Sequence, residues 1–236
     1  MVHTFPNSIT IDGPASSGKS TIGERLAEQL GYLYFDTGCM YRAVTAVALR
    51  RGVDIYSEVQ VGALAERIRI EIRPSTADDG RQYTVLADGE DVTWALRDPD
   101  VDANVSIVSA YPRVRAILTE EMRRLGERGA VVMVGRDIGT VVMPDAPLKI
   151  YLDASVEERA RRRHAENVAR GQASDYEAVL VSLRERDRID SKRATAPLRP
   201  AYDAHIIDTT GLSPEQVLDS IGQLMNKERQ RHDGVR

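Results

Sequence analysis

Cysteine and histidine are scarce in this chain, and their scarcity excludes two kinds of site. A single cysteine, Cys39, among 236 residues permits no internal disulfide and supplies too few thiolates for a structural zinc site. The four histidines are scattered and show no metal-ligand spacing. Any metal is therefore expected to arrive with a substrate.

Lysine is also rare, whereas arginine is abundant. The lysines are Lys19, Lys149, Lys192 and Lys227, and all other basic residues are arginines. The planar guanidinium grips phosphates and carboxylates through paired hydrogen bonds, so this bias favours an enzyme that handles oxyanions. A genome-wide arginine bias would produce the same composition. The net charge of −4 argues against a general nucleic-acid binder.

Long apolar runs are missing as well. The longest, such as residues 129–134, fall far short of the roughly 18 residues needed to cross a bilayer. Residues 1–10 lack the basic start and apolar core of a secretory signal. With 42% hydrophobic and 29% charged residues, the composition is typical of a soluble globular protein. We therefore expect a cytoplasmic protein that is not embedded in a membrane.

Hydrophobic periodicity predicts alternating strands and helices within one domain, residues 1–236. Short apolar runs predict strands at residues 8–12, 32–35, 130–134, 148–152 and 205–208. Helical spacing predicts helices at residues 19–30, 40–51, 112–128 and 155–170, and a last helix that begins at Ser213-Pro214. This pattern indicates an α/β fold in which helices cover both faces of a five-stranded parallel sheet, giving three layers.

Residues 68–93 break this alternation. Isoleucines alternate with charged residues at the start of the segment, and Asp79-Gly80 and Asp88-Gly89 are turn signals. They predict a small antiparallel β insertion. Trp94, the single tryptophan, is expected to pack within this insertion, and Asp98-Pro99-Asp100 is expected to form a turn.

Residues 13–20 carry the clearest chemical signal. Their sequence matches the phosphate-binding loop G-x-x-x-x-G-K-[ST] and lies between a predicted strand and a predicted helix, as that motif requires. Gly13 and Gly18 let backbone N–H groups converge on phosphates at the positive end of the helix. Lys19 would reach the β- and γ-phosphates, and Ser20 would bind the Mg²⁺ that accompanies a nucleoside triphosphate. The predicted ATP-binding residues are Gly13, Pro14, Ala15, Ser16, Ser17, Gly18, Lys19, Ser20 and Thr21.

Phosphate-binding loops serve molecular switches, motors and small-molecule kinases. A GTPase switch needs a guanine-reading N-K-x-D motif, but Asn226-Lys227-Glu228-Arg229 lacks the aspartate. Asp208-Thr209-Thr210-Gly211 resembles a D-x-x-G switch motif only in following a predicted strand. The sequence therefore favours a kinase.

Further motifs are spread over nearly the whole chain. They are Ile11-Asp12-Gly13-Pro14, Asp36-Thr37-Gly38 followed by Met40-Tyr41-Arg42, Tyr111-Pro112-Arg113-Val114-Arg115, Gly135-Arg136-Asp137-Ile138-Gly139-Thr140-Val141-Val142, and Glu185-Arg186-Asp187 ahead of Arg193-Ala194-Thr195-Ala196-Pro197-Leu198. In these motifs the chain resembles the bacterial cytidylate kinases, which are nucleoside monophosphate kinases with a phosphate-binding loop. The resemblance implies transfer of the γ-phosphate of ATP, with Mg²⁺, to CMP or dCMP. We expect a monomer whose partners are these nucleotides, with no nucleic acid and no membrane.

The resemblance also implies which residues bind CMP. Arg42 and Arg136 would hold the acceptor phosphate, with Arg193 close to the phosphates. Arg186 and Asp190 would meet the pentose.

The cytosine would be read by Ser106, Arg115 and Asp137, with Thr37 nearby. Cytosine offers an amino donor at position 4, which a carboxylate attracts, whereas uracil offers an acceptor there. As an alternative, the Asp137 carboxylate would cap the turn at Gly139, a purely structural role.

Two segments take roles from the same resemblance. Residues 37–115 would form the monophosphate-binding region, and residues 155–175 a mobile lid. In that lid, Arg159, Arg162 and Arg163 would approach the transferring phosphate. Because an arginine-rich helix can also simply face solvent, at least one of residues 161–163 is expected only to pair with a neighbouring glutamate, Glu157 or Glu158.

Two positions depart from the family pattern. Val134 stands where members often carry an acidic residue that orients water on Mg²⁺, so the metal would depend on Ser20, and on Asp12 through water. Ser20 itself replaces a glycine common in the family and adds a hydroxyl ligand. Two alternatives stay open: another small-molecule phosphotransferase, such as a uridylate-preferring or shikimate-type kinase, and a non-catalytic ATP-binding regulator.

Overall fold

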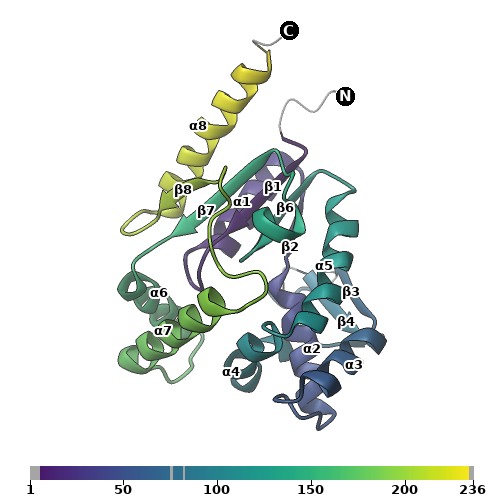
Figure 1. Cartoon of the computed structure of the whole chain (residues 1–236). Coiled ribbons are helices and arrows are strands. Elements are labelled where there is room, and N and C mark those ends of the chain that lie inside the picture. Colours follow the sequence, from purple (N-terminus) through teal and green to yellow (C-terminus); the bar gives the residue numbers. More distant parts are fainter. Residues whose placement is uncertain (1–5, 75–76, 82, 234–236) are drawn as a thin grey trace. The chain divides into compact units, whose positions relative to one another are not determined.

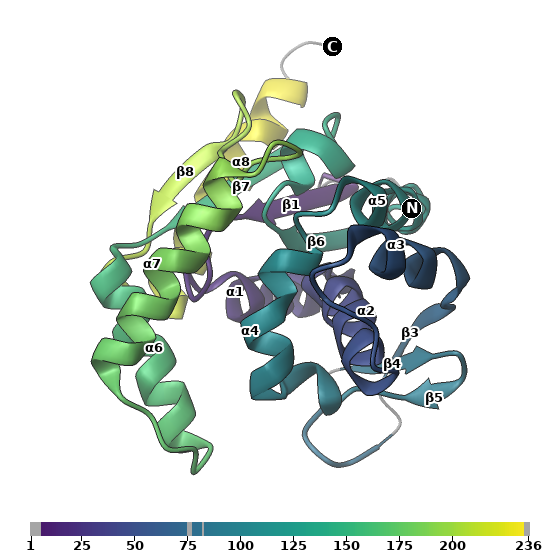
Figure 2. The same ribbon diagram turned by 60° about the horizontal axis from the view of Figure 1, so that its bottom comes forward.

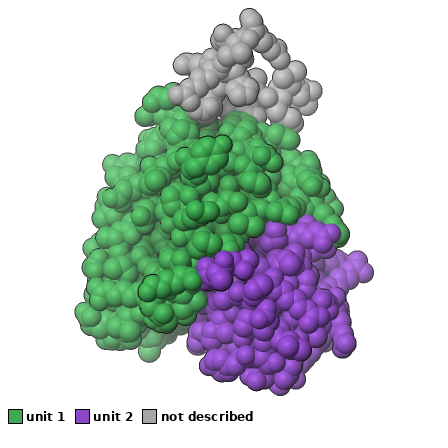
Figure 3. Space-filling model, in the orientation of Figure 1, with its two compact units in different colours: residues 1–36, 123–192, 196–236 green, residues 37–122, 193–195 purple. Residues whose placement is uncertain are grey.

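The chain divides into two compact units, coloured separately in Figure 3. The computed structural model describes residues 6–74, 77–81 and 83–233. Unit 1 comprises Met1–Asp36, Arg123–Lys192 and Ala196–Arg236, and unit 2 comprises Thr37–Met122 and Arg193–Thr195. The predicted monophosphate-binding region, residues 37–115, therefore falls inside unit 2.

Unit 1 is built on a five-stranded sheet (Figure 1). In spatial order its strands are β2 (Leu33–Asp36), β6 (Val131–Gly135), β1 (Ser8–Asp12), β7 (Leu148–Asp153) and β8 (His205–Asp208). Every neighbouring pair is parallel. The strands β1 and β6 are buried along their whole length, as inner strands of a parallel sheet usually are. The predicted five-stranded parallel sheet is confirmed.

One face of this sheet packs against α1 (Lys19–Leu30) and α8 (Pro214–Asp233). Ile22 and Leu26 of α1 and Ile221 of α8 meet the alternate apolar side chains of the strands there. Both helices begin where the sequence predicts, α1 after Gly18 and α8 after Ser213. Gly31, with φ of 66°, ends α1 in a left-handed conformation that glycine adopts without strain.

The other two helices of unit 1 form a pair beside the sheet. Figure 2 shows α6 (Val156–Ala169) and α7 (Tyr176–Lys192) running side by side. The Ser155 hydroxyl caps α6 by accepting a hydrogen bond from the Glu158 N–H at 3.2 Å. No helix was predicted for α7.

Unit 2 combines helices with a small antiparallel sheet. Its helices are α2 (Gly38–Arg50), α3 (Glu58–Arg67), α4 (Pro99–Val108) and most of α5 (Pro112–Gly126), with a 3-10 turn at Ala95–Arg97. The sheet joins β3 (Ile70–Pro74), β4 (Tyr83–Ala87) and β5 (Glu90–Asp91) in that order. The predicted hairpins of the β insertion are confirmed, although its residues 75, 76 and 82 lie outside the described part.

One local prediction in unit 2 is wrong. Asp98-Pro99-Asp100 is not an isolated turn, because Pro99 is the first residue of α4, where its fixed φ suits a helix. Trp94 is 42% exposed but lies against the insertion as expected, with the Arg81 guanidinium 5.9 Å from its ring centroid. Its Nε1 donates to Asp79 at 3.0 Å, and the Arg97 guanidinium lies 4.8 Å from the ring centroid. Among the described residues no helix is both long and apolar enough to span a membrane.

Candidate active site

The phosphate-binding loop turns between β1 and α1 at the carboxyl edge of the unit 1 sheet, where ligands commonly bind in α/β proteins. Gly13 has φ of 149°, and a Cβ there would lie 2.1 Å from the Leu152 carbonyl oxygen. Gly18 has φ of 96° and directly precedes the helix. Both glycines are therefore required by this path of the backbone.

Lys19 is buried under the loop that it follows. Its Nζ donates to the Pro14 carbonyl oxygen at 2.6 Å. Burial lowers its pKa to about 7, and the positive charge of Arg136 adds to this effect, whereas the Asp36 carboxylate opposes it. Anionic phosphates at the loop would favour the charged form of this lysine.

Ser20 was predicted as a Mg²⁺ ligand, but its neighbour Asp36 was not. The Ser20 hydroxyl donates to Oδ2 of Asp36, the last residue of β2, at 3.2 Å. Mg²⁺ is usually bound by one or two protein oxygens together with substrate phosphates, and a hydroxyl beside a carboxylate provides such oxygens. The described residues contain no group of three or more His, Cys, Asp or Glu side chains placed to hold a metal by themselves. The position of Asp36 directly after the strand predicted at residues 32–35 was the available signal.

Asp12 lies at the end of β1, and its side chain binds backbone N–H groups. Its carboxylate oxygens accept hydrogen bonds from the Ile138 N–H at 2.8 Å and the Gly139 N–H at 2.7 Å. Burial raises its pKa to about 7, although the two backbone hydrogen bonds oppose that shift. Asp12 thus ties β1 to the single π-helical turn Ile138–Val142.

This tie settles the alternative role considered for Asp137. The Asp137 side chain makes no capping hydrogen bond to the turn, because the N–H groups of Ile138 and Gly139 are bound by Asp12. The alternative in which Asp137 caps the Gly139 turn is therefore not borne out. Val134, the other unusual position, is 1% exposed and belongs to the apolar core under α1.

The arginines of α6 occupy three different environments. Arg159 is 4% exposed and donates to the Ala15 carbonyl oxygen in the phosphate loop at 3.2 Å. Arg163 Nε donates to the Ser16 hydroxyl of the same loop at 3.2 Å. Arg162 instead donates to the Thr209 hydroxyl at 3.0 Å.

Arg161 differs from these three arginines. Its side chain is 68% exposed and pairs with Glu158 one turn away. The expectation that at least one of residues 161–163 serves as a solvated face is confirmed by this residue.

Four predicted CMP-binding residues belong to unit 1, namely Arg136, Asp137, Arg186 and Asp190. Arg136 Nε binds the Asp190 carboxylate, and Asp190 is buried. Although burial opposes the charge of Arg136, the Asp190 carboxylate raises its pKa. The structure thus brings Arg136 and Asp190 into one ion pair.

Unit 2 holds Thr37, Arg42, Ser106, Arg115 and Arg193. Arg42 donates to the Leu96 carbonyl oxygen at 3.0 Å and to Asp102 Oδ1 at 2.6 Å. Arg115 is buried, donates to the Ser109 carbonyl oxygen at 3.0 Å, and lies 5.3 Å from the Tyr41 ring centroid. Both guanidiniums are held in place by their own unit.

A parallel α/β sheet with a glycine loop, a buried lysine and surrounding arginines defines a P-loop kinase. A sequence model of the family described as "Cytidylate kinase" matches residues 9–227. The chain belongs to the cytidylate kinase family, as its motifs predicted, and is an ATP-dependent nucleoside monophosphate kinase by class.

Curated relatives agree with this assignment. The chain is 52% identical over 227 residues to a cytidylate kinase of Herpetosiphon aurantiacus, covering 96% of this chain and 97% of the relative. It is 53% identical over 214 residues to a cytidylate kinase of Anoxybacillus flavithermus, covering 91% and 93%. A solved structure of an uncharacterised protein from Eubacterium ventriosum aligns with a TM-score of 0.50 at 13% identity, over 93% of this chain and 98% of that one, which is a likeness of fold alone.

Proposed function

We propose that this chain transfers the γ-phosphate of ATP to CMP or dCMP, giving CDP or dCDP and ADP. The observation that carries the proposal is the phosphate loop of unit 1, in which Lys19 lies buried beneath the glycine turn. Membership of the cytidylate kinase family supports the choice of acceptor.

Transfer between two anions requires positioning and charge neutralisation more than covalent participation by the protein. The loop N–H groups and Lys19 would bind the β- and γ-phosphates of ATP. Arg163, which contacts Ser16 of the loop, would supply further positive charge to the transferring group. The predicted role of residues 155–175 as a lid would exclude water during transfer.

Magnesium would be held by Ser20 and Asp36 together with phosphate oxygens of ATP. The distance of 3.2 Å between their oxygens supports this choice. Mg²⁺ would supply neutralisation of charge on the phosphates. Asp12, with both oxygens accepting backbone hydrogen bonds, is less suited to this role than Asp36.

The acceptor would be bound by residues predicted from the family. Arg42 and Arg136 would bind the phosphate of CMP, with Arg193 close by. The full set for CMP is Thr37, Arg42, Ser106, Arg115, Arg136, Asp137, Arg186, Asp190 and Arg193. Of these, Ser106, Arg115 and Asp137 would recognise cytosine. A monomer in the cytoplasm remains our expectation.

A coupled assay that measures ADP release across acceptors tests this proposal. We expect turnover with CMP and dCMP at least about tenfold above that with UMP, because an unpaired buried polar group costs roughly 1–3 kcal/mol. Faster turnover with UMP or shikimate than with CMP would show that the proposed acceptor is wrong. ATP binding without turnover on any acceptor would favour a regulator.

A further inference from the structure

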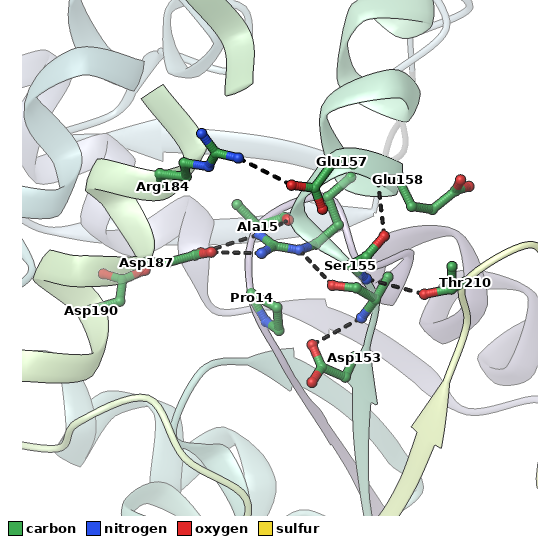
Figure 4. Close-up of polar contacts among 12 residues, drawn as sticks. Pro14, Ala15, Asp153, Ser155, Glu157, Glu158, Arg184, Asp187, Asp190 and Thr210 are labelled. Atoms are coloured by element: carbon green, nitrogen blue, oxygen red, sulfur yellow. Dashed lines mark hydrogen bonds and ion pairs between the residues drawn. The ribbon is translucent and has the colours of Figure 1, made fainter. Parts of the chain in front are cut away.

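The Arg159 guanidinium connects three segments of unit 1, and two of its partners, Ala15 and Asp187, are labelled in Figure 4. Its Nε donates to the Ala154 carbonyl oxygen after β7 at 3.0 Å, and its Nη1 donates to the Ala15 carbonyl oxygen at 3.2 Å. Its two Nη atoms also donate to the two carboxylate oxygens of Asp187 on α7, at 3.1 and 2.6 Å. The phosphate loop, the end of β7 and α7 are therefore joined through one side chain of α6.

These contacts leave Arg159 little freedom. A guanidinium has five N–H donors, and its hydrogen bonds to Ala154, Ala15 and Asp187 use four of them. To reach the transferring phosphate, Arg159 would have to give up the phosphate loop or Asp187. Its geometry is that of a fixed connection, unlike the exposed Arg161 on the same helix.

The carboxylate of Asp187 is the charged partner in this connection. Arg159 has a side chain that is only 5% exposed, and a buried cation is costly unless it is paired and hydrogen-bonded. Without Asp187, Arg159 would keep the carbonyl oxygens of Ala154 and Ala15 as acceptors, and neither of them carries a formal charge.

Apolar packing joins the same segments. Ala15 of the loop shares a small buried cluster with Ala160 of α6 and with Leu180 and Leu183 of α7. The loop carbonyl that accepts from Arg159 is therefore fixed on a packed surface, so a shift of the guanidinium would be transmitted to the loop.

We propose that Asp187 is a positioning residue for ATP binding: it holds Arg159 against the Ala15 carbonyl and thereby keeps the phosphate loop in its binding conformation. In this role Arg159 also positions the loop and does not neutralise the transferring phosphate, which revises the lid function predicted for it. The inference deepens the proposed function, because it assumes that the loop binds ATP.

A second ion pair between the same two helices provides a matched control. Arg184 of α7 donates to Glu157 of α6 at 3.1 Å, and both side chains are more than half exposed, at 58% and 53%. Figure 4 shows this pair near Asp187. Exposed pairs contribute little to stability, and among the described residues neither of these two side chains hydrogen-bonds to the phosphate loop.

The experiment compares Asp187→Asn with Arg184→Gln. We measure the equilibrium Kd for ATP without acceptor, the KM for ATP and for CMP, kcat, and Tm. Asp187→Asn should raise the Kd and KM for ATP about tenfold, because charge-assisted hydrogen bonds to a buried arginine are lost. The KM for CMP should change less than threefold, and Arg184→Gln should leave all constants within about twofold.

Arg159→Lys separates positioning from direct catalysis. If Arg159 positions the loop, this variant raises the Kd for ATP and changes kcat by only a few fold. A large fall in kcat with an unchanged Kd for ATP would instead place Arg159 on the transferring phosphate and overturn the proposal.

Two further outcomes would also overturn it: an unchanged ATP Kd in folded Asp187→Asn, or an equal rise in Arg184→Gln. If Asp187→Asn does not fold, Asp187→Glu keeps the charge and tests the same Kd, which should rise by less than in Arg159→Lys. Since ATP binding is measured without acceptor, failure to phosphorylate CMP would reject the proposed function and leave this test intact.

Discussion

The cations around the phosphate loop of unit 1 are held differently from the surface ion pairs of unit 2. In unit 1, Lys19, Arg136 and Arg159 are buried or nearly so, and each is bound by a backbone carbonyl or a carboxylate. In unit 2, pairs such as Arg50–Glu90 and Arg51–Asp88 lie at the surface, with every side chain at least 36% exposed. Charges fixed around a phosphate loop act without reorganisation, whereas surface pairs are screened by solvent.

This difference predicts where substitutions will matter. Loss of a buried charge in unit 1 should alter catalysis or stability strongly. Loss of a partly exposed charge in unit 2 should change binding moderately. Four substitutions test this contrast, and we expect their effects to decrease from Lys19→Ala to Asp102→Asn.

The largest effect is expected from Lys19→Ala. This substitution removes the cation beneath the phosphate loop, so kcat should fall by at least about a hundredfold, because such a charge supplies several kcal/mol of transition-state stabilisation. Circular dichroism and Tm should show a folded protein. Near-normal turnover in that folded variant would show that the phosphate loop does not take part in catalysis.

Asp137→Asn should have the next largest effect. If this carboxylate accepts from the amino group of cytosine, kcat/KM for CMP should fall about ten- to a hundredfold while UMP loses less or gains. The ratio of the two substrates is the measurement. An unchanged ratio of CMP to UMP turnover would mean that Asp137 does not read the base. Its role would then be structural, but not as the cap of the Gly139 turn, because Asp12 binds the Gly139 N–H.

Asp12→Asn should affect stability and its pH dependence. An amide cannot accept both backbone hydrogen bonds through two oxygens, so unfolding free energy at low pH should drop by about 1–3 kcal/mol. The sign of the pH effect follows from a folded-state pKa raised from 3.8 to about 7. The folded protein keeps this proton when the unfolded chain has lost it, so the stabilisation by Asp12 falls as pH rises from about 4 to about 7.

Urea unfolding of the wild type and Asp12→Asn between pH 5 and 8 measures this difference. Taking the difference between the two proteins removes the contributions of groups that titrate alike in both. A stability difference that stays constant over this range would mean that Asp12 is ionised throughout.

The smallest effect is expected in unit 2 from Asp102→Asn. Asp102 binds Arg42 at 2.6 Å, and its negative charge would oppose a phosphate arriving at the same guanidinium. Its removal should lower the KM for CMP by about two- to fivefold, a modest change because the Asp102 side chain is 41% exposed. Arg51→Gln, which breaks a surface pair elsewhere in unit 2, is the control. A raised KM would show that Asp102 orients Arg42 for binding.

The same contrast between units explains what could be predicted from the sequence. The unit 1 strands were placed to within about two residues, because buried parallel strands are continuous apolar runs. The phosphate loop was found because its spacing is dictated by phosphate geometry. In unit 2, α4 was not predicted, because Pro99 marks both turns and helix starts. The helices α3 of unit 2 and α7 of unit 1 were also not predicted.

The site residues that escaped prediction act through distant partners. Asp36 meets Ser20 from another strand, and Asp187 meets Arg159 from a neighbouring helix. Both aspartates stand in motifs shared with the family, but the sequence does not show which side chain each of them meets. Their roles become visible only when the sheet and helices bring the partners together.

The central claim is that the loop of unit 1 passes phosphate from ATP to CMP. Phosphorus NMR of the purified chain with ATP, CMP and Mg²⁺ tests it most directly, because transfer and hydrolysis give different products. We predict that the CMP and ATP γ-phosphate signals decline together while CDP and ADP appear in equal amounts, with little inorganic phosphate. Unchanged CMP, or ATP consumption that yields inorganic phosphate and ADP alone, would contradict the claim.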